Sequence, residues 1–377
     1  MLTKPKLFAL LLSFVFYCSM GASSYAQPSN KFKVLAYFAG NVAQLDSFDV
    51  QKITHIIYCF GHLNGNQFIL GKPADTLIIQ KMVSLKSQNP QLKVLISLGG
   101  WGGCETCSDV FATSKGRKEF SESVKQVQTR FGTDGIDLDW EYPAVEGPPG
   151  HKYTPEDKQS FTLLVKELRK ELGKSSIISF AAGGFNNFLD KSVEWKKVMK
   201  KADFVNLMTY DLVNGYATTT GHHTPLYSTP QQVESTDNAV RYLLNLGIAP
   251  EKLVIGGAFY GRIFENVPAT NNGLYQPGKF KTAEVYKNFP ITLSPDSGFV
   301  YHWDDVAKAP YLYNPQQQLF VSFDDRRSID LKAKYVTDKK LGGIMFWQLA
   351  QDVPNGGLLE AINDVKKNYT SAATSVK

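Results

Sequence analysis

The chain has 377 residues, of which 43% are hydrophobic and 20% charged, which is the composition of an ordinary soluble globular protein with one large domain or two to three average ones. Its formal net charge of +6 is mild, and no run of Lys or Arg indicates a nucleic-acid partner. Aromatic residues make up 12%, and because aromatic faces stack on sugars and on bases, this excess favours either ligand class without separating them.

Residues 1–26 have the pattern of a secretory signal peptide. Lys4 and Lys6 form a positive start, residues 7–20 are an apolar run, and small residues precede a cleavage point after Ala26. The apolar run is too short for a typical membrane span, so an N-terminal anchor is the weaker reading. A lipid anchor at Cys18 is disfavoured because bulky Tyr17 precedes it. We therefore expect a secreted protein, extracellular or periplasmic, that is not held in a membrane.

From residue 32 onward, apolar strand-like runs alternate with amphipathic helical stretches such as 116–131, 155–172 and 235–247. Strands rich in Val, Ile and Leu that are joined by helices indicate a parallel sheet with a covered outer face. Eight such units fit a (β/α)8 TIM barrel. An open doubly wound sheet is the alternative, but no GxGxxG follows the first strand. The expected strands are 32–40, 53–61, 92–100, 135–143, 176–184, 203–211, 252–261 and 341–350.

The interval between the seventh and eighth expected strands is longer than the others. The excess, at about 263–320, holds short aromatic strands separated by Gly and Pro turns. We expect a small α+β insertion there, within a single catalytic barrel domain that covers 27–377. No appended binding module is expected after the eighth helix.

The segment DGIDLDWEYP, residues 134–143, places acidic residues in what otherwise reads as a buried strand. Because strand side chains alternate between faces, Asp137, Asp139 and Glu141 share one face while the apolar residues between them share the other. The alternative without a function is a strand face whose acids are simply solvated. A magnesium or calcium site is also conceivable, but no His lies nearby and the surroundings are aromatic. We therefore expect a catalytic site without a metal or cofactor.

The carboxyl ends of barrel strands are where active sites lie. Aromatic faces with convergent acids at that level describe a sugar-binding cleft with acid catalysis. Glu141 would need a raised pKa to arrive protonated, and Asp139 is expected close enough to share a proton with Asp137 or to hydrogen-bond to Glu141. The residues expected at this level are Tyr37, Phe60, Ser97, Trp101, Glu141, Met208, Tyr210, Asp211, Tyr260, Arg262 and Trp347.

The cysteines and histidines give weaker signals. Cys104 and Cys107 form a CxxC pair, which in a secreted chain predicts a small disulfide loop more readily than a zinc half-site, since no second pair follows. Cys59 lies in an apolar run and is read as an inert buried thiol. His222 and His223 lack partner spacing and are read as structural or rim residues.

Several of these segments match one known family. DGIDLDWEYP is similar to the DxxDxDxE signature of glycoside hydrolase family 18, the chitinases. KVLISLGG resembles the family's SxGG strand, NLMTYD its MxYD strand, FYGR its YGR motif, and LGGIMFWQL its last strand with the floor tryptophan. The resemblance runs from about residue 32 to 365, and the insertion resembles the α+β domain that deepens the cleft in one chitinase subfamily.

The resemblance implies a role for each matching acid. Glu141 matches the general acid/base, Asp139 the residue that holds the substrate's N-acetyl group, and Asp137 its buried partner, alongside Tyr37 and Ser97. Tyr210 and Asp211 match the residues that position the acetamido group. No enzyme nucleophile is then implied, because the acetamido carbonyl attacks the anomeric carbon, forms an oxazolinium ion and leads to retention.

The resemblance also implies substrate-binding positions. Trp347 matches the floor of the −1 subsite, and Trp101 and Tyr142 match positions that line the cleft. Tyr216 stands where many relatives have tryptophan, which implies weaker or differently angled stacking. Plain barrel packing is the alternative for each position. The remaining wall residues are Phe60, Met208, Tyr260 and Arg262.

Three functions fit these features. The first is a secreted, monomeric chitinase that cleaves β-1,4 bonds between N-acetylglucosamine units of chitin or its oligosaccharides. The second is an endo-β-N-acetylglucosaminidase that acts on N-glycan cores through the same chemistry, although such enzymes generally lack the insertion. The third is a chitin-binding, lectin-like member of the family, a reading that usually requires the acid at Glu141 to be lost.

Overall fold

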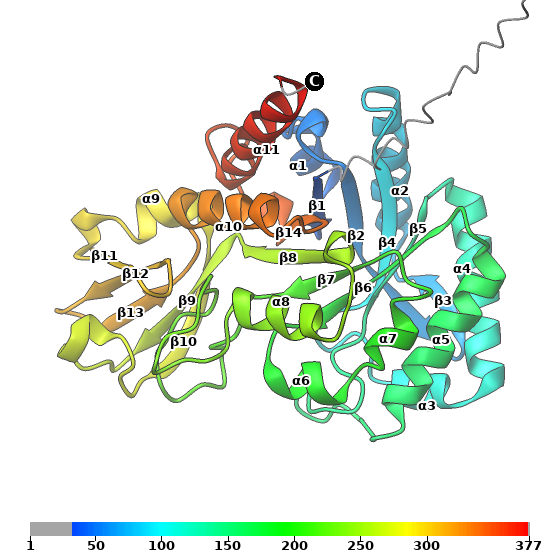
Figure 1. Ribbon diagram of the computed structural model, residues 1–377, viewed down its shortest axis with the longest axis horizontal. Coiled ribbons are helices and arrows are strands. Elements are labelled where there is room, and N and C mark those ends of the chain that lie inside the picture. The colour runs from blue at the N-terminus through cyan, green and yellow to red at the C-terminus, as the bar shows by residue number, and fades with distance from the viewer. Residues whose placement is uncertain (1–31, 376–377) are drawn as a thin grey trace, which may run out of the picture. The chain divides into compact units, whose positions relative to one another are not determined.

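The computed structural model describes residues 32–375, and a closed barrel of eight parallel strands lies at its centre (Figure 1). The expected signal peptide lies outside the described residues. Each strand pairs in parallel with the next, and β14 pairs with β1, which closes the barrel. The predicted (β/α)8 fold is confirmed. Its strands are β1 (Lys33–Phe38), β2 (His55–Asn64), β4 (Lys93–Gly99), β5 (Gly135–Asp139), β6 (Ile177–Gly183), β7 (Phe204–Met208), β8 (Leu253–Ala258) and β14 (Gly343–Trp347).

Helices surround the barrel strands in Figure 1. The expected helix at 116–131 is α4 (Ser114–Phe131), in which the Thr113 side chain accepts the Gly116 N–H at the start and Gly132 ends the helix in the left-handed conformation. The others are α1 (Val42–Asp46), α2 (Pro73–Ser84), α3 (Cys107–Ala112), α5 (Asp157–Leu172), α6 (Asn186–Lys191), α7 (Trp195–Val198), α8 (Thr236–Asn245), α10 (Arg326–Asp338) and α11 (Leu358–Ser375).

The alternation of strand side chains divides the core into two layers. Ile136, Leu138 and Trp140 join the large apolar cluster between the strands and the helices. The opposite faces point into the barrel, where a smaller cluster that includes Tyr37 and Met345 fills the interior. The acidic face of β5 therefore points into the barrel, as the period-two pattern predicted.

One strand was not expected from the sequence. β3 (Gln67–Leu70) pairs antiparallel with the end of β2, so that β2 runs to Asn64 and beyond the predicted end at residue 61. Gly65, with a φ of 56°, makes the turn between them.

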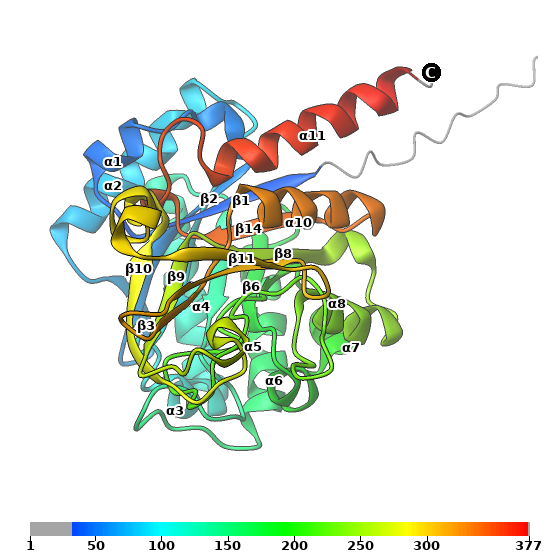
Figure 2. The same ribbon diagram turned by 90° about the vertical axis from the view of Figure 1, so that its left-hand side faces the viewer.

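A second, antiparallel sheet stands between β8 and β14. Its order is β10-β9-β13-β12-β11; Figure 1 shows these strands beside the barrel, and Figure 2 turns that side of the molecule toward the viewer. The short α9 (Phe289–Thr292) lies within this insertion. Tyr260 and Arg262 belong to its first strand, which starts two residues after β8 ends. The strands are β9 (Tyr260–Glu265), β10 (Lys279–Val285), β11 (Val300–Asp304), β12 (Ala309–Asn314) and β13 (Leu319–Ser322).

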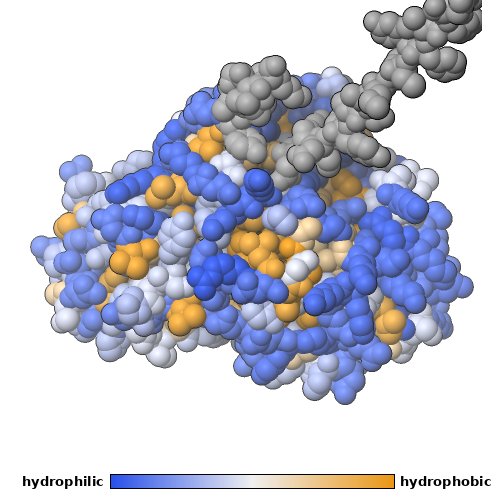
Figure 3. Space-filling model, in the orientation of Figure 1, coloured by the Kyte–Doolittle hydropathy of each residue, from blue (hydrophilic) through white to orange (hydrophobic). Residues whose placement is uncertain are grey.

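The surface is mostly hydrophilic on the face shown in Figure 3, with apolar patches between polar residues. Among residues 32–375, no helix combines the length and the apolar character needed to cross a membrane.

Candidate active site

Asp137 is the most deeply buried of the acids on β5, with none of its surface exposed. Its Oδ2 accepts hydrogen bonds from the Tyr37 hydroxyl at 3.0 Å and the Ser97 hydroxyl at 2.8 Å. Its Oδ1 accepts from the Ser179 hydroxyl at 2.6 Å and from Asn206 Nδ2 at 3.2 Å. Burial raises the pKa of Asp137, and these neutral donors partly oppose the rise.

Asp139 lies one inward step further along β5 and is 4% exposed. Burial raises its pKa well above the usual range, and the neighbouring charges of Glu141 and Asp137 add to the rise. Its Oδ1 has no hydrogen-bond partner among the described residues. That Asp139 shares a proton with Asp137 or hydrogen-bonds to Glu141 stays a prediction. The four hydrogen bonds to Asp137 described above come from other residues.

Glu141 lies two residues beyond the end of β5, which is shorter than the predicted strand. It is 9% exposed, and burial raises its pKa to about 7, with the Asp211 charge adding to the rise and the Tyr142 hydroxyl opposing it. At neutral and lower pH much of this carboxyl is therefore protonated. A buried carboxylic acid that is protonated near neutral pH can act as a general acid.

Asp211 follows β7 and has the opposite electrostatic setting. Arg262 donates to both carboxylate oxygens, from Nε at 2.7 Å and from Nη2 at 2.7 Å, and the Tyr260 hydroxyl donates at 2.8 Å. Burial alone would raise the pKa of Asp211, but the neighbouring His223 ring and the hydrogen bonds and charge of Arg262 hold it well below its usual range. Asp211 is thus a fixed anion.

Aromatic rings form the floor and walls around these acids. Trp347, at the end of β14, stacks on Phe60 with ring centroids 5.7 Å apart and lies 6.1 Å from Tyr37. The Tyr210 hydroxyl contacts Met345 Sδ at 3.8 Å, and the Tyr210 ring meets Tyr260 edge-on at 6.1 Å. Phe60 and Trp347 are partly buried against the barrel-interior cluster, of which Met208 is a buried member.

Two exposed aromatic rings stand at the rim. Trp101 is 52% exposed and Tyr216 is 61% exposed, and their ring centroids are 6.2 Å apart. Trp101 also meets the Tyr142 ring at 6.3 Å. Exposed aromatic faces at this position are free to stack on sugar rings.

Comparison with known proteins agrees with this geometry. Residues 26–352 match the glycosyl hydrolases family 18. The chain belongs to this family. It is 28% identical to chitinase A1 of Niallia circulans over 97% of this chain, although it spans only 65% of that relative. It is 33% identical to chitotriosidase-1 of Mus musculus, over 81% of this chain and 68% of that protein.

Solved structures of family 18 proteins share the fold. A chitinase from Bacillus thuringiensis superimposes with a TM-score of 0.84 at 29% identity, covering 90% of this chain and 70% of that one. A family 18 N-acetylglucosaminidase from Paenibacillus barengoltzii superimposes with a TM-score of 0.81 at 35% identity, covering 89% and 99%. The resemblance drawn from the motifs is thereby confirmed, and the chain is a glycoside hydrolase.

The two histidines of this family 18 chain lie behind the site. Both are fully buried, so neither stands at the rim. His222 Nε2 lies 3.0 Å from an Asp304 oxygen and joins the loop after β7 to the insertion. His223 Nδ1 accepts the Asp211 N–H at 3.4 Å and lies 3.5 Å from that residue's Oδ1. Both therefore have structural contacts. Asp211, with its left-handed φ of 55°, is held at its backbone as well as its side chain.

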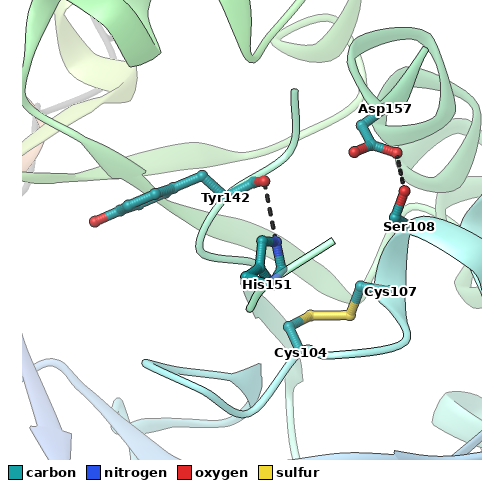
Figure 4. The surroundings of a disulfide bond; sticks show 6 residues. All are labelled: Cys104, Cys107, Ser108, Tyr142, His151 and Asp157. Atoms are coloured by element: carbon teal, nitrogen blue, oxygen red, sulfur yellow. Dashed lines mark hydrogen bonds between the residues drawn. A yellow bond between two sulfur atoms is a disulfide. The ribbon is translucent and has the colours of Figure 1, made fainter. Parts of the chain in front are cut away.

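The cysteines have the predicted states. Cys104 and Cys107 form a disulfide, drawn in Figure 4, while Cys59 is a free, buried thiol in the barrel interior.

Ser179 and Asn206 are site residues that the sequence reasoning missed. Ser97 and Ser179 lie directly opposite Asp137 in the register of β4, β5 and β6. Asn206 also donates to the Tyr37 hydroxyl at 3.0 Å. The available signal was period-two alternation: Asn206 lies two residues before the predicted wall residue Met208, and a polar residue that points into a barrel needs a partner.

Proposed function

We propose that this protein is a secreted chitinase that hydrolyses β-1,4 linkages between N-acetylglucosamine units of chitin or its oligosaccharides. The names of its relatives support this substrate class. Secretion rests on the signal-peptide pattern of residues 1–26, and N-terminal sequencing of the exported protein would test it, with a start just after Ala26 as the expected result.

The observation that carries the mechanism is the state of Asp211. A two-carboxylate glycosidase needs a second acid that is free to act as nucleophile or base. Here Asp211 is bound by Arg262 and Tyr260 through three hydrogen bonds, and Asp137 is buried beneath four donors. Neither can turn toward an anomeric carbon. Asp139 is not the charged carboxylate that attack requires, because burial and the charges of Glu141 and Asp137 raise its pKa well above the usual range, which favours a nucleophile from the substrate itself.

The reaction then has two steps. Glu141 gives its proton to the glycosidic oxygen while the acetamido carbonyl oxygen bonds to the anomeric carbon and the glycosidic bond breaks. Asp139, whose Oδ1 has no partner among the described residues, accepts the acetamido N–H and so holds the acetamido carbonyl toward the anomeric carbon. The Glu141 carboxylate next takes a proton from water, whose oxygen attacks the anomeric carbon and opens the ring. Two inversions give net retention.

Proton NMR of N-acetylchitotetraose with the mature protein tests this proposal. Early appearance of the β-anomer is the expected result. Early α-anomer would reject the acetamido mechanism and require a second carboxylate base. The Glu141→Gln protein, prepared in parallel, shows whether the cleavage comes from this site.

A second candidate keeps the chemistry and changes the substrate. The likeness to an N-acetylglucosaminidase at 35% identity favours considering it, and N-glycan cores are one such substrate. Release of glycan from a glycoprotein, without release of soluble sugar from chitin, would select it. A lectin-like function is disfavoured because Glu141 is present and its environment raises its pKa to about 7.

A further inference from the structure

Two loops form the rim on the side of Glu141. The loop after β4 carries Trp101 and leads to α3, and the loop after β5 carries Tyr142 and leads to α5. The Cys104–Cys107 disulfide joins the end of the first loop to the first residue of α3. Figure 4 shows it together with side chains of both loops.

The disulfide packs directly behind the end of the catalytic strand. A Cβ at Gly99 would lie 3.5 Å from Cys104 Sγ and 2.4 Å from the Asp139 carbonyl oxygen, so only glycine fits between them. The next residue, Gly100, donates its N–H to that same carbonyl at 2.9 Å. Cys104 is 2% exposed and Cys107 is fully buried.

The start of α3 then holds the second loop. The Ser108 hydroxyl donates to Asp157 Oδ1 at 2.7 Å. Asp157 Oδ2 accepts the N–H groups of Thr154 at 2.8 Å and Ala144 at 3.4 Å, which lie at the two ends of that loop. Asp157 is 1% exposed, so these bonds are shielded from water.

Two contacts complete the connection. Lys152, in the second loop, pairs with Asp109 on α3. His151 has a ring nitrogen 3.2 Å from the Tyr142 carbonyl oxygen, as Figure 4 shows. The backbone of Tyr142 is thereby tied to the same loop that α3 holds.

The disulfide adds to the core packing of Val110 and Phe111 in holding α3, which is short. This helix spans six residues, and Thr106 at its start makes no side-chain capping bond. A helix of this length is not stable without tertiary support. The covalent bond fixes its first turn, and Ser108 and Asp109 lie in that turn.

We propose that the Cys104–Cys107 disulfide positions a binding site for long substrates. Through Ser108 and Asp157 it holds Tyr142 against Trp101. The ligand is a chitooligosaccharide long enough to reach Trp101, so this inference rests on the proposed function. Loss of the bond raises the KM for long oligosaccharides and leaves the KM for short ones unchanged, because only a long substrate reaches Trp101.

The test compares N-acetylchitohexaose with N-acetylchitotriose. In the double variant Cys104→Ser, Cys107→Ser we expect KM for the hexaose to rise about three- to ten-fold, the scale of one aromatic contact. The KM for the triose stays within about two-fold of the parent value. Ser108→Ala should shift the hexaose KM in the same direction. Ser121→Ala is the matched control, because it removes a buried hydroxyl that donates to the Arg117 carbonyl oxygen in α4. This variant should leave the hexaose KM unchanged.

A double-mutant cycle tests whether the effect passes through Trp101. In a Trp101→Ala background, the cysteine substitutions should add nothing to the hexaose KM. Multiplying effects would overturn the proposal. So would a Ser108→Ala protein with an unchanged hexaose KM, and so would equal losses on both substrates.

Binding keeps this result separate from the proposed function. Calorimetric titration measures the affinity of Glu141→Gln protein for the hexaose with and without the disulfide. The affinity should be about three- to ten-fold lower when the disulfide is absent. Binding with this loss but no cleavage by the parent would reject the chitinase function alone. No hexaose binding by the parent would reject both.

Discussion

The three acids on and just after β5 lie near Asp211, which follows β7, and the two environments push the pKa values in opposite directions. The acids on and just after β5 have neutral groups or other carboxylates as neighbours, and burial raises the pKa of Asp137, Asp139 and Glu141. Asp211 has Arg262 and His223, and its pKa is held well below the usual range. One set is suited to exchange protons, and the other is suited to keep its charge.

The difference shows that burial does not determine the function of an acid. What separates these groups is a cation within hydrogen-bond distance, since desolvation penalises the charged form in both places. When the environments of neighbouring acids separate their pKa values, the acid with the raised pKa serves as proton donor and the acid with the lowered pKa stays charged. The predictions below alter one side of this comparison at a time.

The largest effect is expected from removing the proton of Glu141. Glu141→Gln keeps the shape of the side chain but cannot ionise, so we expect hydrolysis of N-acetylchitotetraose to fall by at least ~100-fold. Calorimetry should show oligosaccharide binding intact. Activity near that of the parent enzyme would remove Glu141 from its role.

The same substitution should change how stability depends on pH. The folded pKa of Glu141 is about 7 and its ordinary value is 4.5, so the folded protein holds this proton more tightly than the unfolded chain. The resulting stabilisation is complete below about pH 4.5 and is lost as pH rises through about 7. Between pH 4 and pH 8 the parent should lose about 3 kcal/mol more unfolding free energy than Glu141→Gln, measured by urea denaturation. Parallel pH profiles would contradict this.

Arg262→Met should make Asp211 resemble the acids of β5. It removes two charged hydrogen bonds, and because the two side chains are 21% and 31% exposed, water screens part of the loss. We expect about 2 kcal/mol of destabilisation near neutral pH, by urea denaturation. Because folding lowers the pKa of Asp211, this stabilisation is fully present above about pH 3.8, the ordinary pKa of the group. The stabilisation is lost as the pH falls below that value.

A surface pair supplies the control for that prediction. Arg241 contacts Asp237 one helical turn away at 3.5 Å, with 69% of the Arg241 side chain exposed. Arg241→Met should therefore change stability by less than about 0.5 kcal/mol. An equal loss of unfolding free energy in Arg262→Met and Arg241→Met would mean that the ion pair at Asp211 is no stronger than a surface pair.

The smallest effect is expected at the rim, away from both groups of acids. Tyr216→Trp enlarges an exposed ring 6.2 Å from Trp101 and touches no carboxylate. We expect hexaose binding to tighten by less than about three-fold, with the pH profile of kcat unchanged. Calorimetry and a pH series measure the two quantities, and a shifted pH profile would show that the rim acts on the acids.

Features that depend on local periodicity could be predicted from the amino-acid sequence. Alternation placed Asp137 and Asp139 on the inward face of one strand, and apolar runs separated by helices predicted the barrel. The family motifs placed Tyr37 and Ser97 beside Asp137. Each of these follows from the pleat of one strand or from a short motif.

Only the tertiary structure decided which groups meet. Ser179 and Asn206 complete the setting of Asp137 through strand register, which no single segment encodes. Among residues 32–375, Asp139 Oδ1 has no partner. Arg262 reaches Asp211 across 51 positions of the chain because β9 starts beside the end of β8. Desolvation and Coulomb interactions depend on distances in space, so the protonation states at this site belong to the fold.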